Sequence, residues 1–350
     1  MPPDSTHGAA PSAASPEDRA FCDEILPRVS RTFALSISML PESLRDAVRA
    51  AYLLCRIVDT IEDDTSVPLE VRRPIFAEFD ALMRDDARDP TAFEASAEVF
   101  RGEWAEAALC SRAGATFRSF RGLSEAQREA IRPSVLEMSH GMQQYVERMV
   151  EAPLASIADL TDLERYCYFV AGTVGELLTP LFLLDNPGIS AELESSLRER
   201  AVSFGLGLQL VNIVKDVADD LERGICFVPR ELLSSFGLSV HELLDERQRE
   251  AGLAVVRAIC RVARTHLERA REYTCLWPTS ASAVRLFCAV PLALALGTLG
   301  VVEQGDDTLR AGRNPKVSRE FVTRLIADAQ FVVRDDGQLL AYFESAARGE

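Results

Sequence analysis

Two segments of the sequence carry acidic side chains at helical spacing. In the first segment, a tyrosine, an arginine and two aspartates fall at i, i+4, i+7 and i+11, on one face of an α-helix: Tyr52, Arg56, Asp59 and Asp63. Almost all other residues between positions 50 and 61 are apolar. A helix that is apolar around most of its circumference is buried, and isolated buried charges are very costly. We therefore expect this polar stripe to face an internal cavity or a partner.

The second segment, residues 204–220, repeats the arrangement. Its polar positions fall at i, i+3, i+7 and i+10 or i+11, again on one helix face: Gln209, Asn212, Asp216 and either Asp219 or Asp220. One such stripe alone is more often a solvated helix face. Two matched stripes on otherwise apolar helices favour an internal site that both stripes share.

Carboxylates at this spacing suit a small hard cation. Side chains at i and i+4 are separated by about 6 Å of helix rise, so both can reach one ion or a pair of ions. Oxygen ligands without Cys or His select Mg2+ or Mn2+, and Mg2+ keeps waters and phosphate oxygens around it. Arg56 and Lys215 add positive charge beside the acidic pairs. The pattern therefore indicates a diphosphate site with apolar walls, as a prenyl diphosphate requires.

Composition disfavours several other classes of protein. The 350 residues carry a net charge of -16, which disfavours general binding to nucleic acid. The eight cysteines form no CxxC pair and the four histidines are scattered, so neither a zinc ribbon nor a thioredoxin motif is expected. Because the N-terminus lacks a secretory signal, we expect the cysteines to be reduced thiols.

Helical periodicity dominates the chain, and no alternating run of β-branched residues is bounded by hairpin turns. We expect an all-α fold of about ten helices, built as one domain over residues 18–350. Residues 1–17, rich in Pro, Ala and Ser, are expected to form a disordered tail. Amphipathic outer helices are predicted over four segments: 68–86, 94–112, 190–202 and 240–274.

The longest apolar stretch, residues 281–302, contains Arg285 and Pro291. If these residues interrupt it, the remaining run is shorter than the ~20 residues of a membrane-spanning helix, so a buried core helix is predicted. We expect neither a signal peptide nor a transmembrane helix. The resulting expectation is a cytoplasmic protein, in peripheral contact with the inner membrane face at most, that is a monomer or a weak homodimer.

Five blocks of sequence, two of which contain the acidic stripes, occur in a recognisable order: "VSRTFALSISMLP" at 29–41, "RIVDTIEDD" at 56–64, "RYCYFVAGTVGELLTPLF" at 165–182, "LQLVNIVKDVADDLERGICFVPRE" at 208–231 and "RLFCAVPLALA" at 285–295. In these blocks, and over residues 25–345 as a whole, the chain resembles the squalene and phytoene synthase family of head-to-head isoprenoid coupling enzymes. The resemblance implies an all-α bundle around a central apolar cavity, with two facing aspartate-rich helices.

The resemblance also implies roles for individual residues. The metal ligands would be the acidic residues of the two motifs: Asp59, Glu62, Asp63, Asp216 and Asp220. Substrate would be bound near the cavity mouth and beside the second motif: Ser30, Arg31, Thr32, Phe33, Gln209 and Lys215. Catalytic roles would fall to four side chains: Tyr52, Arg56, Tyr166 and Phe287. Tyr166 is expected to relay a proton, with diphosphate itself as the rival base, and the aromatic faces to stabilise carbocations.

The reaction implied is the Mg2+-dependent coupling of two farnesyl diphosphates through presqualene diphosphate to squalene, with reduction by NADPH. Reductive members of the family share a late Lys-x-Arg motif, whereas this chain has Lys316 and Arg319 one residue further apart, in "PKVSRE". We expect this pair and Asn212 to bind the cofactor. The altered spacing leaves open a product made without reduction.

Several alternatives follow from the same residues. Without a reductive step the product would be presqualene diphosphate, dehydrosqualene or, from C20 substrates, phytoene. A non-catalytic homologue that binds prenyl diphosphate is disfavoured by the intact aspartates, and a class I terpene cyclase by the "VAG" and "FVPRE" blocks. Eukaryotic members end in a membrane-spanning helix, which the final "LLAYFESAARGE" does not resemble. A soluble enzyme that visits the membrane to release its product is therefore expected.

Overall fold

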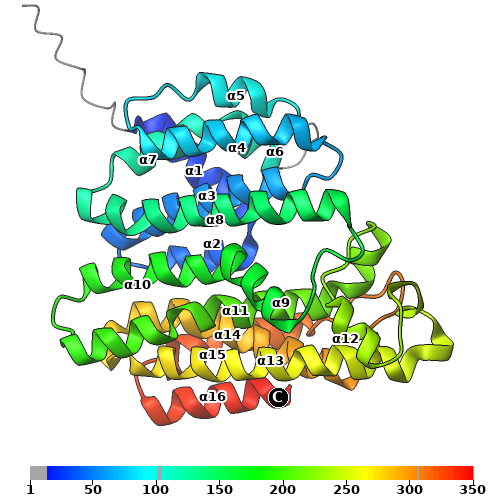
Figure 1. Cartoon of the computed structure of the whole chain (residues 1–350). Coiled ribbons are helices and arrows are strands. Elements are labelled where there is room, and N and C mark those ends of the chain that lie inside the picture. The colour runs from blue at the N-terminus through cyan, green and yellow to red at the C-terminus, as the bar shows by residue number, and fades with distance from the viewer. Residues whose placement is uncertain (1–13, 101–104, 306, 350) are drawn as a thin grey trace, which may run out of the picture.

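The computed structural model describes residues 14–100, 105–305 and 307–349, apart from the side chain of Arg31. Within these ranges the chain is helical and contains no strand, which confirms the expected all-α class (Figure 1). The first half forms α1 (Pro16–Val29), α2 (Arg31–Ser38), α3 (Glu42–Asp63), α4 (Leu69–Arg84), α5 (Thr91–Ala97), α6 (Ala105–Ser111), α7 (Ala113–Arg121) and α8 (Glu125–Glu151).

The second half continues the helical bundle. It forms α9 (Leu160–Cys167), α10 (Thr173–Asp185), α11 (Ala191–Glu222), α12 (Arg230–Ser235), α13 (Arg249–Leu276), α14 (Ser282–Gln304), α15 (Arg319–Val332) and α16 (Asp336–Arg348). Four short turns complete it: the π-helix η1 (Tyr168–Gly172) and the 3-10 helices η2 (Val240–Glu242), η3 (Glu246–Gln248) and η4 (Thr279–Ala281).

The described residues thus form more helices than expected, because some predicted segments divide. Segment 94–112 contains parts of two short helices, α5 and α6, with residues 101–104 outside the description. Segment 190–202 is only the start of α11, which begins at the N-cap Ser190 and continues for 32 residues. Of the expected tail, residues 1–13 lie outside the description, and α1 begins at Pro16 after a capping box made by Ser15 and Asp18.

Figure 1 shows the helices in two groups. α1 and α3–α7 lie in the upper part of the view, α8 crosses the middle, and α10, α11, α13 and α14 lie below, with α16 at the bottom. Buried apolar side chains gather in two corresponding clusters, one mainly from α1–α8 and one mainly from α11–α16. The acidic segment 56–64 therefore ends a helix of the first group, while segment 208–220 lies on a helix of the second.

Close backbone contact joins α10 and η1 to α11. A Cβ atom on Gly175 would lie 2.0 Å from the carbonyl oxygen of Ala201, and one on Gly205 would lie 2.0 Å from that of Ala171. Any side chain at either glycine would therefore separate the helices. α11 packs directly against η1 and α10 as a result, and the π-helical turn of the "YFVAG" block becomes part of an internal wall.

Among the residues that the structure describes, three helical segments are long and apolar enough to cross a membrane, judged by length and composition: Leu160–Asp185, Ala191–Glu222 and Thr279–Gln304. The expectation of no such helix is therefore wrong, and the cytoplasmic location inferred from it loses its basis. The physical reason is clear in α14, which runs through both Arg285 and Pro291 without a break. The predicted core helix is present there, since 67% of the most apolar window of this segment is buried inside the fold.

Candidate active site

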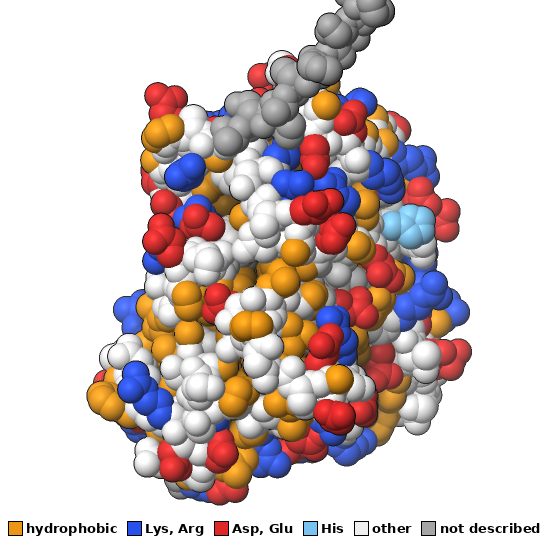
Figure 2. Space-filling view, turned by 90° about the vertical axis from the view of Figure 1, so that its left-hand side faces the viewer, with side chains coloured by type: hydrophobic (Ala, Val, Ile, Leu, Met, Phe, Trp, Pro, Cys, Tyr) orange, Lys and Arg blue, Asp and Glu red, His pale blue; other side chains and the backbone are white. Residues whose placement is uncertain are grey.

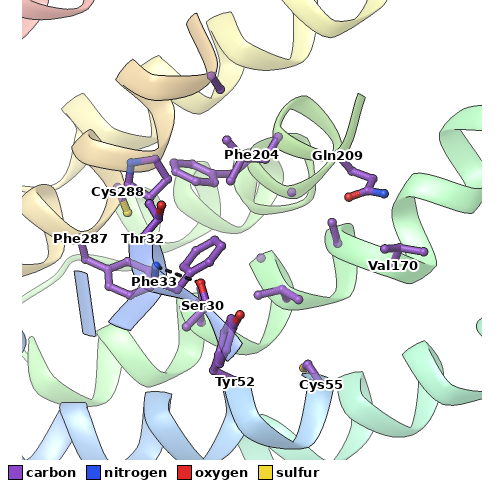
Figure 3. Close-up of a pocket in the computed structure, with 18 of the residues that line it drawn as sticks. Ser30, Thr32, Phe33, Tyr52, Cys55, Val170, Phe204, Gln209, Phe287 and Cys288 are labelled. Carbon is purple, nitrogen blue, oxygen red and sulfur yellow. Dashed lines mark hydrogen bonds between the residues drawn. The ribbon is translucent and has the colours of Figure 1, made fainter. Parts of the chain in front are cut away.

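A cavity of about 460 Å3 lies between the two helix groups. Ten of the predicted site residues line it: Ser30, Thr32, Phe33, Tyr52, Arg56, Asp59, Gln209, Asn212, Lys215 and Phe287. They come from α2, α3, α11 and α14, and Figure 3 shows several of them around the same space. The remaining predicted residues do not line it: Glu62, Asp63, Tyr166, Asp216, Asp220, Lys316 and Arg319. The side chain of Arg31 is outside the description.

Arg56 and Asp59 form a charged end of this cavity. Arg56 Nη2 donates to Glu106 Oε1 over 2.9 Å, and Arg56 Nη1 lies 3.6 Å from Asp59 Oδ2. Asp59 Oδ1 is buried and has no hydrogen-bond partner. Burial raises the pKa of Asp59 to about 7, although the charge of Arg56 opposes this shift. The carboxyl group is therefore poised for a partner that supplies positive charge.

Glu62 and Asp63 continue the first motif beyond the cavity lining. Glu62 is buried and accepts a hydrogen bond from Tyr166 Oη over 3.3 Å. Burial, and then the charge of Asp63, raise the pKa of Glu62 well above its usual range. Asp63 is the exposed last residue of α3. Asp64 is the C-cap residue of α3 and accepts from the Ser66 amide over 3.0 Å.

The second motif is held by positively charged and amide groups. Lys215 Nζ donates to Asp216 Oδ2 over 2.6 Å, and Asn314 Nδ2 donates to Asp216 Oδ1, also over 2.6 Å. Asp220 is buried and forms an ion pair with Arg223. Burial raises the pKa of Asp220 to about 6, with smaller upward contributions from the charges of Asp216 and Asp63. The influence of Asp63 on Asp220 shows that the two motifs face each other closely enough to interact.

These groups fit a divalent cation. Their donors are oxygens, as Mg2+ prefers, and the buried Asp59 Oδ1, which has no hydrogen-bond partner, is available to such an ion. Among the described residues, no three His, Cys, Asp or Glu side chains already converge on one point. A cation here would therefore be completed by diphosphate oxygens and waters rather than by protein alone.

Ser30 and Tyr52 line the cavity near the start of α2. Ser30 Oγ caps α2 by accepting from the Phe33 amide over 3.2 Å, and the Phe33 ring lies 5.4 Å from the Tyr52 ring (Figure 3). Burial raises the pKa of Tyr52 to about 12, so its phenol stays neutral at physiological pH. Tyr52 can therefore present a neutral hydroxyl and an aromatic face to the cavity.

Aromatic rings line the apolar end of the cavity. Phe287 packs edge to face on Phe182 with ring centroids 5.5 Å apart, and Phe204 packs against Tyr273 at 5.9 Å. All four side chains line the cavity. Sequence analysis identified only Phe287 among them, because the other three appear in the sequence as ordinary core residues. These four rings thus give the cavity an apolar, aromatic part in addition to its charged residues.

Tyr166 lies beside the first motif in a separate aromatic cluster. Its ring stacks on Phe227 with centroids 4.9 Å apart and contacts Tyr145 edge to face at 5.1 Å. Burial, and then the charge of Glu62, raise the pKa of Tyr166 well above its usual range. Tyr166 is therefore a neutral hydrogen-bond donor to Glu62 and not a phenolate base.

Lys316 and Arg319 are exposed and stand away from the cavity lining, on the loop before α15 and at its first turn. Asn314 connects this loop to the second motif, as described above. Sequence analysis missed Asn314, Glu106 and Arg223. Arg223 follows Asp220 at i+3 and could have been found from helical spacing. The other two contact the motifs from distant parts of the chain, and no local pattern identifies them.

The helical bundle, its cavity and the two opposed acidic motifs define an enzyme of the isoprenoid-coupling class. A family model described as Squalene/phytoene synthase matches residues 26–320. The chain belongs to the squalene/phytoene synthase family and is an enzyme that transfers prenyl groups.

Curated relatives and solved structures agree with this membership. Squalene synthase ERG9 of Candida albicans is 30% identical over 319 residues, covering 88% of this chain and 67% of the relative. The squalene synthase of Nicotiana benthamiana is 31% identical, with 88% and 71% covered. A solved complex of TcSQS with the ligand BPH1237 superposes with a TM-score of 0.76 and 25% identity, over 95% of this chain and 98% of that one. The chain thus spans about two thirds of the length of these curated relatives.

A more distant likeness concerns the fold alone. A solved dehydrosqualene synthase with a bound ligand has a TM-score of 0.63 and 21% identity, covering 90% of this chain and 95% of that one.

Proposed function

We propose that this enzyme condenses two farnesyl diphosphates head to head, through presqualene diphosphate, to squalene. One observation carries the proposal: a single cavity has Arg56, Asp59 and Lys215 at its charged end and aromatic rings along its apolar part. This arrangement suits a substrate with a diphosphate head and a long hydrocarbon tail. Similarity to squalene synthases supports farnesyl diphosphate as that substrate.

Mg2+, with Mn2+ as an alternative, would be held by Asp59, Glu62 and Asp63 on α3 and by Asp216 and Asp220 on α11. When bound, the ion supplies Lewis-acid stabilisation of the leaving diphosphate. Arg56 and Lys215 both line the cavity and would bind diphosphate oxygens directly. The polar cluster of Ser30, Thr32 and Gln209, with Arg31 and Phe33 in the same block, would orient the head group.

The apolar part of the cavity would protect carbocations. Its side chains exclude water, which would otherwise trap such an intermediate as an alcohol. The faces of Tyr52 and Phe287 line this space and would stabilise positive charge on the substrate carbon chain. Tyr166, held by its hydrogen bond to Glu62, would relay the proton lost in cyclopropane closure, and the departing diphosphate would accept it.

The reductive step would use NADPH. Lys316 and Arg319 would bind its phosphate groups and Asn212, which lines the cavity, would help to place the reduced ring. A second candidate function follows from one observation: Lys316 and Arg319 are exposed, lie outside the cavity lining and have altered spacing. If they bind no reductant, the product is presqualene diphosphate or dehydrosqualene.

One experiment tests these functions. The purified protein is incubated with farnesyl diphosphate and Mg2+, with and without NADPH, and the hydrocarbons are identified by mass spectrometry. Squalene that forms only with NADPH supports the proposal, whereas dehydrosqualene or presqualene diphosphate under both conditions supports the second candidate. A protein that yields only phytoene, from geranylgeranyl diphosphate, contradicts the choice of substrate.

Release of such a product would involve a lipid bilayer, because transfer of a long hydrocarbon into water is very unfavourable. Figure 2 shows hydrophobic side chains gathered near the middle of one face of the molecule, with charged side chains around them. This face would make peripheral contact with the membrane, and the enzyme would act as a monomer or a weak homodimer. Co-sedimentation with lipid vesicles and analytical ultracentrifugation test the two statements separately.

A further inference from the structure

Asn314 fastens the loop between α14 and α15 to the second acidic motif. Its amide nitrogen Nδ2 donates to Asp216 Oδ1 over 2.6 Å and to Asp219 Oδ2 over 2.8 Å. One neutral amide therefore bridges two carboxylates on neighbouring turns of α11. Asn314 lies outside the five sequence blocks named above, so only the tertiary structure brings it to the second motif.

The bridge uses the atoms that a cation would use. Lys215 Nζ already donates to both oxygens of Asp216, and Asn314 adds a further donor to one of them. An oxygen lone pair that accepts an N–H group is not available to coordinate a metal ion. A carboxylate has about four lone-pair sites, and three of those on Asp216 already accept an N–H group. A cation that binds Asp216 through more than the remaining site therefore competes with Lys215 and Asn314.

The hydrogen bonding of the Asn314 side chain is also incomplete, which favours its displacement by a cation. Asn314 Oδ1 is buried and has no hydrogen-bond partner. A buried polar atom without a partner is unfavourable, because it has lost its hydrogen bonds to water. The free-energy cost of the unsatisfied Asn314 Oδ1 therefore partly offsets the gain from its two hydrogen bonds. A cation that competes for the two carboxylates displaces Asn314 more easily as a result.

The same loop carries a predicted cofactor residue. Gly312, two residues before Asn314, donates its amide to Glu222 Oε1 over 3.1 Å, so the loop has a second anchor near the end of α11. Lys316 follows two residues after Asn314. Displacement of the Asn314 side chain therefore changes the restraint on the segment that presents Lys316.

We propose that Asn314 is a positioning residue that occupies the second acidic motif in the metal-free enzyme and releases it when the cation binds. The proposal rests on the metal assignment given under Proposed function. Cation loading thereby becomes coupled to release of the loop at residues 307–318. The segment that carries Lys316 would change its position only after a cation has bound to the second motif.

Asn314→Ala tests the competition. Titration calorimetry of MgCl2 into protein with inorganic diphosphate should show that the variant binds Mg2+ roughly three- to tenfold more tightly than the wild type. Hydrogen exchange of residues 307–318 gives a readout that is independent of activity. In the wild type Mg2+ should speed exchange in this loop, whereas in Asn314→Ala exchange should be fast with and without Mg2+.

Two further variants separate this role from a merely structural one. Arg313→Ala removes the 2.9 Å ion pair with Asp307 within the same loop and should speed exchange while leaving Mg2+ affinity unchanged. Asn314→Asp places a third carboxylate beside Asp216 and Asp219. Its loop should exchange fast without Mg2+, because the like charges repel, and slow down when Mg2+ is added, which reverses the response of the wild type.

The outcomes distinguish the two proposals. If the wild type binds Mg2+ and Asp216→Asn abolishes binding, the metal assignment stands. Unchanged Mg2+ affinity in Asn314→Ala, or a wild-type loop whose exchange does not respond to Mg2+, then overturns the role of Asn314 alone. If the wild type binds no Mg2+ in the presence of diphosphate, both proposals are overturned.

Discussion

Tyr166 Oη donates a hydrogen bond to Glu62 Oε1 over 3.3 Å, and this bond joins α9 to the end of α3. Phe227 stacks on the Tyr166 ring from the loop after α11. Three elements that are far apart in the sequence therefore fix one phenol beside the first acidic motif. Because the phenol and the carboxyl group are both buried, this hydrogen bond holds the Tyr166 hydroxyl in place beside the motif.

The first prediction concerns this pair. Tyr166→Phe removes the hydroxyl but keeps the ring, so the stacking on Phe227 should persist and kcat should fall by about a hundredfold, as expected for loss of a proton-transfer group. Steady-state kinetics with farnesyl diphosphate measures the change. Tyr145→Phe is the matched control, because its hydroxyl donates to Asp162 instead. A Tyr166→Phe enzyme with wild-type turnover would leave diphosphate as the base.

The second prediction concerns the stability of the metal-free enzyme. Burial raises the pKa of Asp59 to about 7, so the folded protein keeps a proton that the unfolded chain loses near its ordinary pKa of about 4. The free energy of unfolding should therefore fall as pH rises between these values. Asp59→Asn carries no ionisable group there and should be more stable than the wild type at pH 8 by roughly 1–2 kcal/mol, although inactive.

Urea denaturation in the presence of a chelator, at about pH 4 and at pH 8, measures this difference. The wild type and Asp59→Asn should be nearly equal at the lower pH, because Asp59 is then protonated. Asp46→Asn changes a more exposed aspartate on the same helix and serves as the control. If Asp59→Asn is the less stable protein at pH 8, the attraction of Arg56 outweighs the burial of Asp59.

The third prediction concerns the pH dependence of metal binding. Carboxylate ligands must lose their protons before they bind a cation, and burial raises the pKa of Asp59 to about 7 and that of Asp220 to about 6. Affinity for Mg2+ should therefore increase from pH 5.5 to pH 8, and binding at pH 6 should release protons. Calorimetry in two buffers of different ionisation enthalpy counts these protons. Binding without proton release at pH 6 would argue against both carboxylates as ligands.

The fourth prediction concerns the attachment of the N-terminal helix. Arg118 donates to both oxygens of Asp18, over 2.6 and 2.9 Å, and these bonds, acting against burial, lower the pKa of Asp18 to about 2. Asp18→Asn should destabilise the protein by about 1–2 kcal/mol at pH 7. The stabilisation by Asp18 is present above its ordinary pKa and is lost as pH falls toward 2.

Thermal or urea unfolding of the two proteins between pH 2 and pH 7 measures the effect. Glu24→Gln is a suitable control on the same helix, because Glu24 and Arg28 form an exposed pair 3.5 Å apart, and its effect should stay below about 0.5 kcal/mol. An Asp18→Asn effect that persists unchanged at pH 2 would show that the contribution is not electrostatic.

Helical periodicity was sufficient to predict the fold class, because burial of one helix face imposes a pattern on the local sequence. The same pattern predicted that Asp59 and Gln209 would face inward from separate helices. It predicted the buried core helix at α14 but not its full apolar length, because Arg285 and Pro291 were expected to interrupt the apolar stretch. A single proline can be tolerated when packing on neighbouring helices compensates for the lost hydrogen bond, and the sequence does not report that packing.

By itself, the sequence determined two polar stripes, their apolar surroundings and the oxygen-rich chemistry of their side chains. Tertiary structure alone decided how these groups are divided: Asp59 borders the cavity, Glu62 turns to Tyr166, and Asp220 pairs with Arg223. It also supplied the partners Glu106 and Asn314. Helix spacing fixes which side chains share a face, whereas contacts between distant segments depend on how the helices pack, and no local pattern encodes that arrangement.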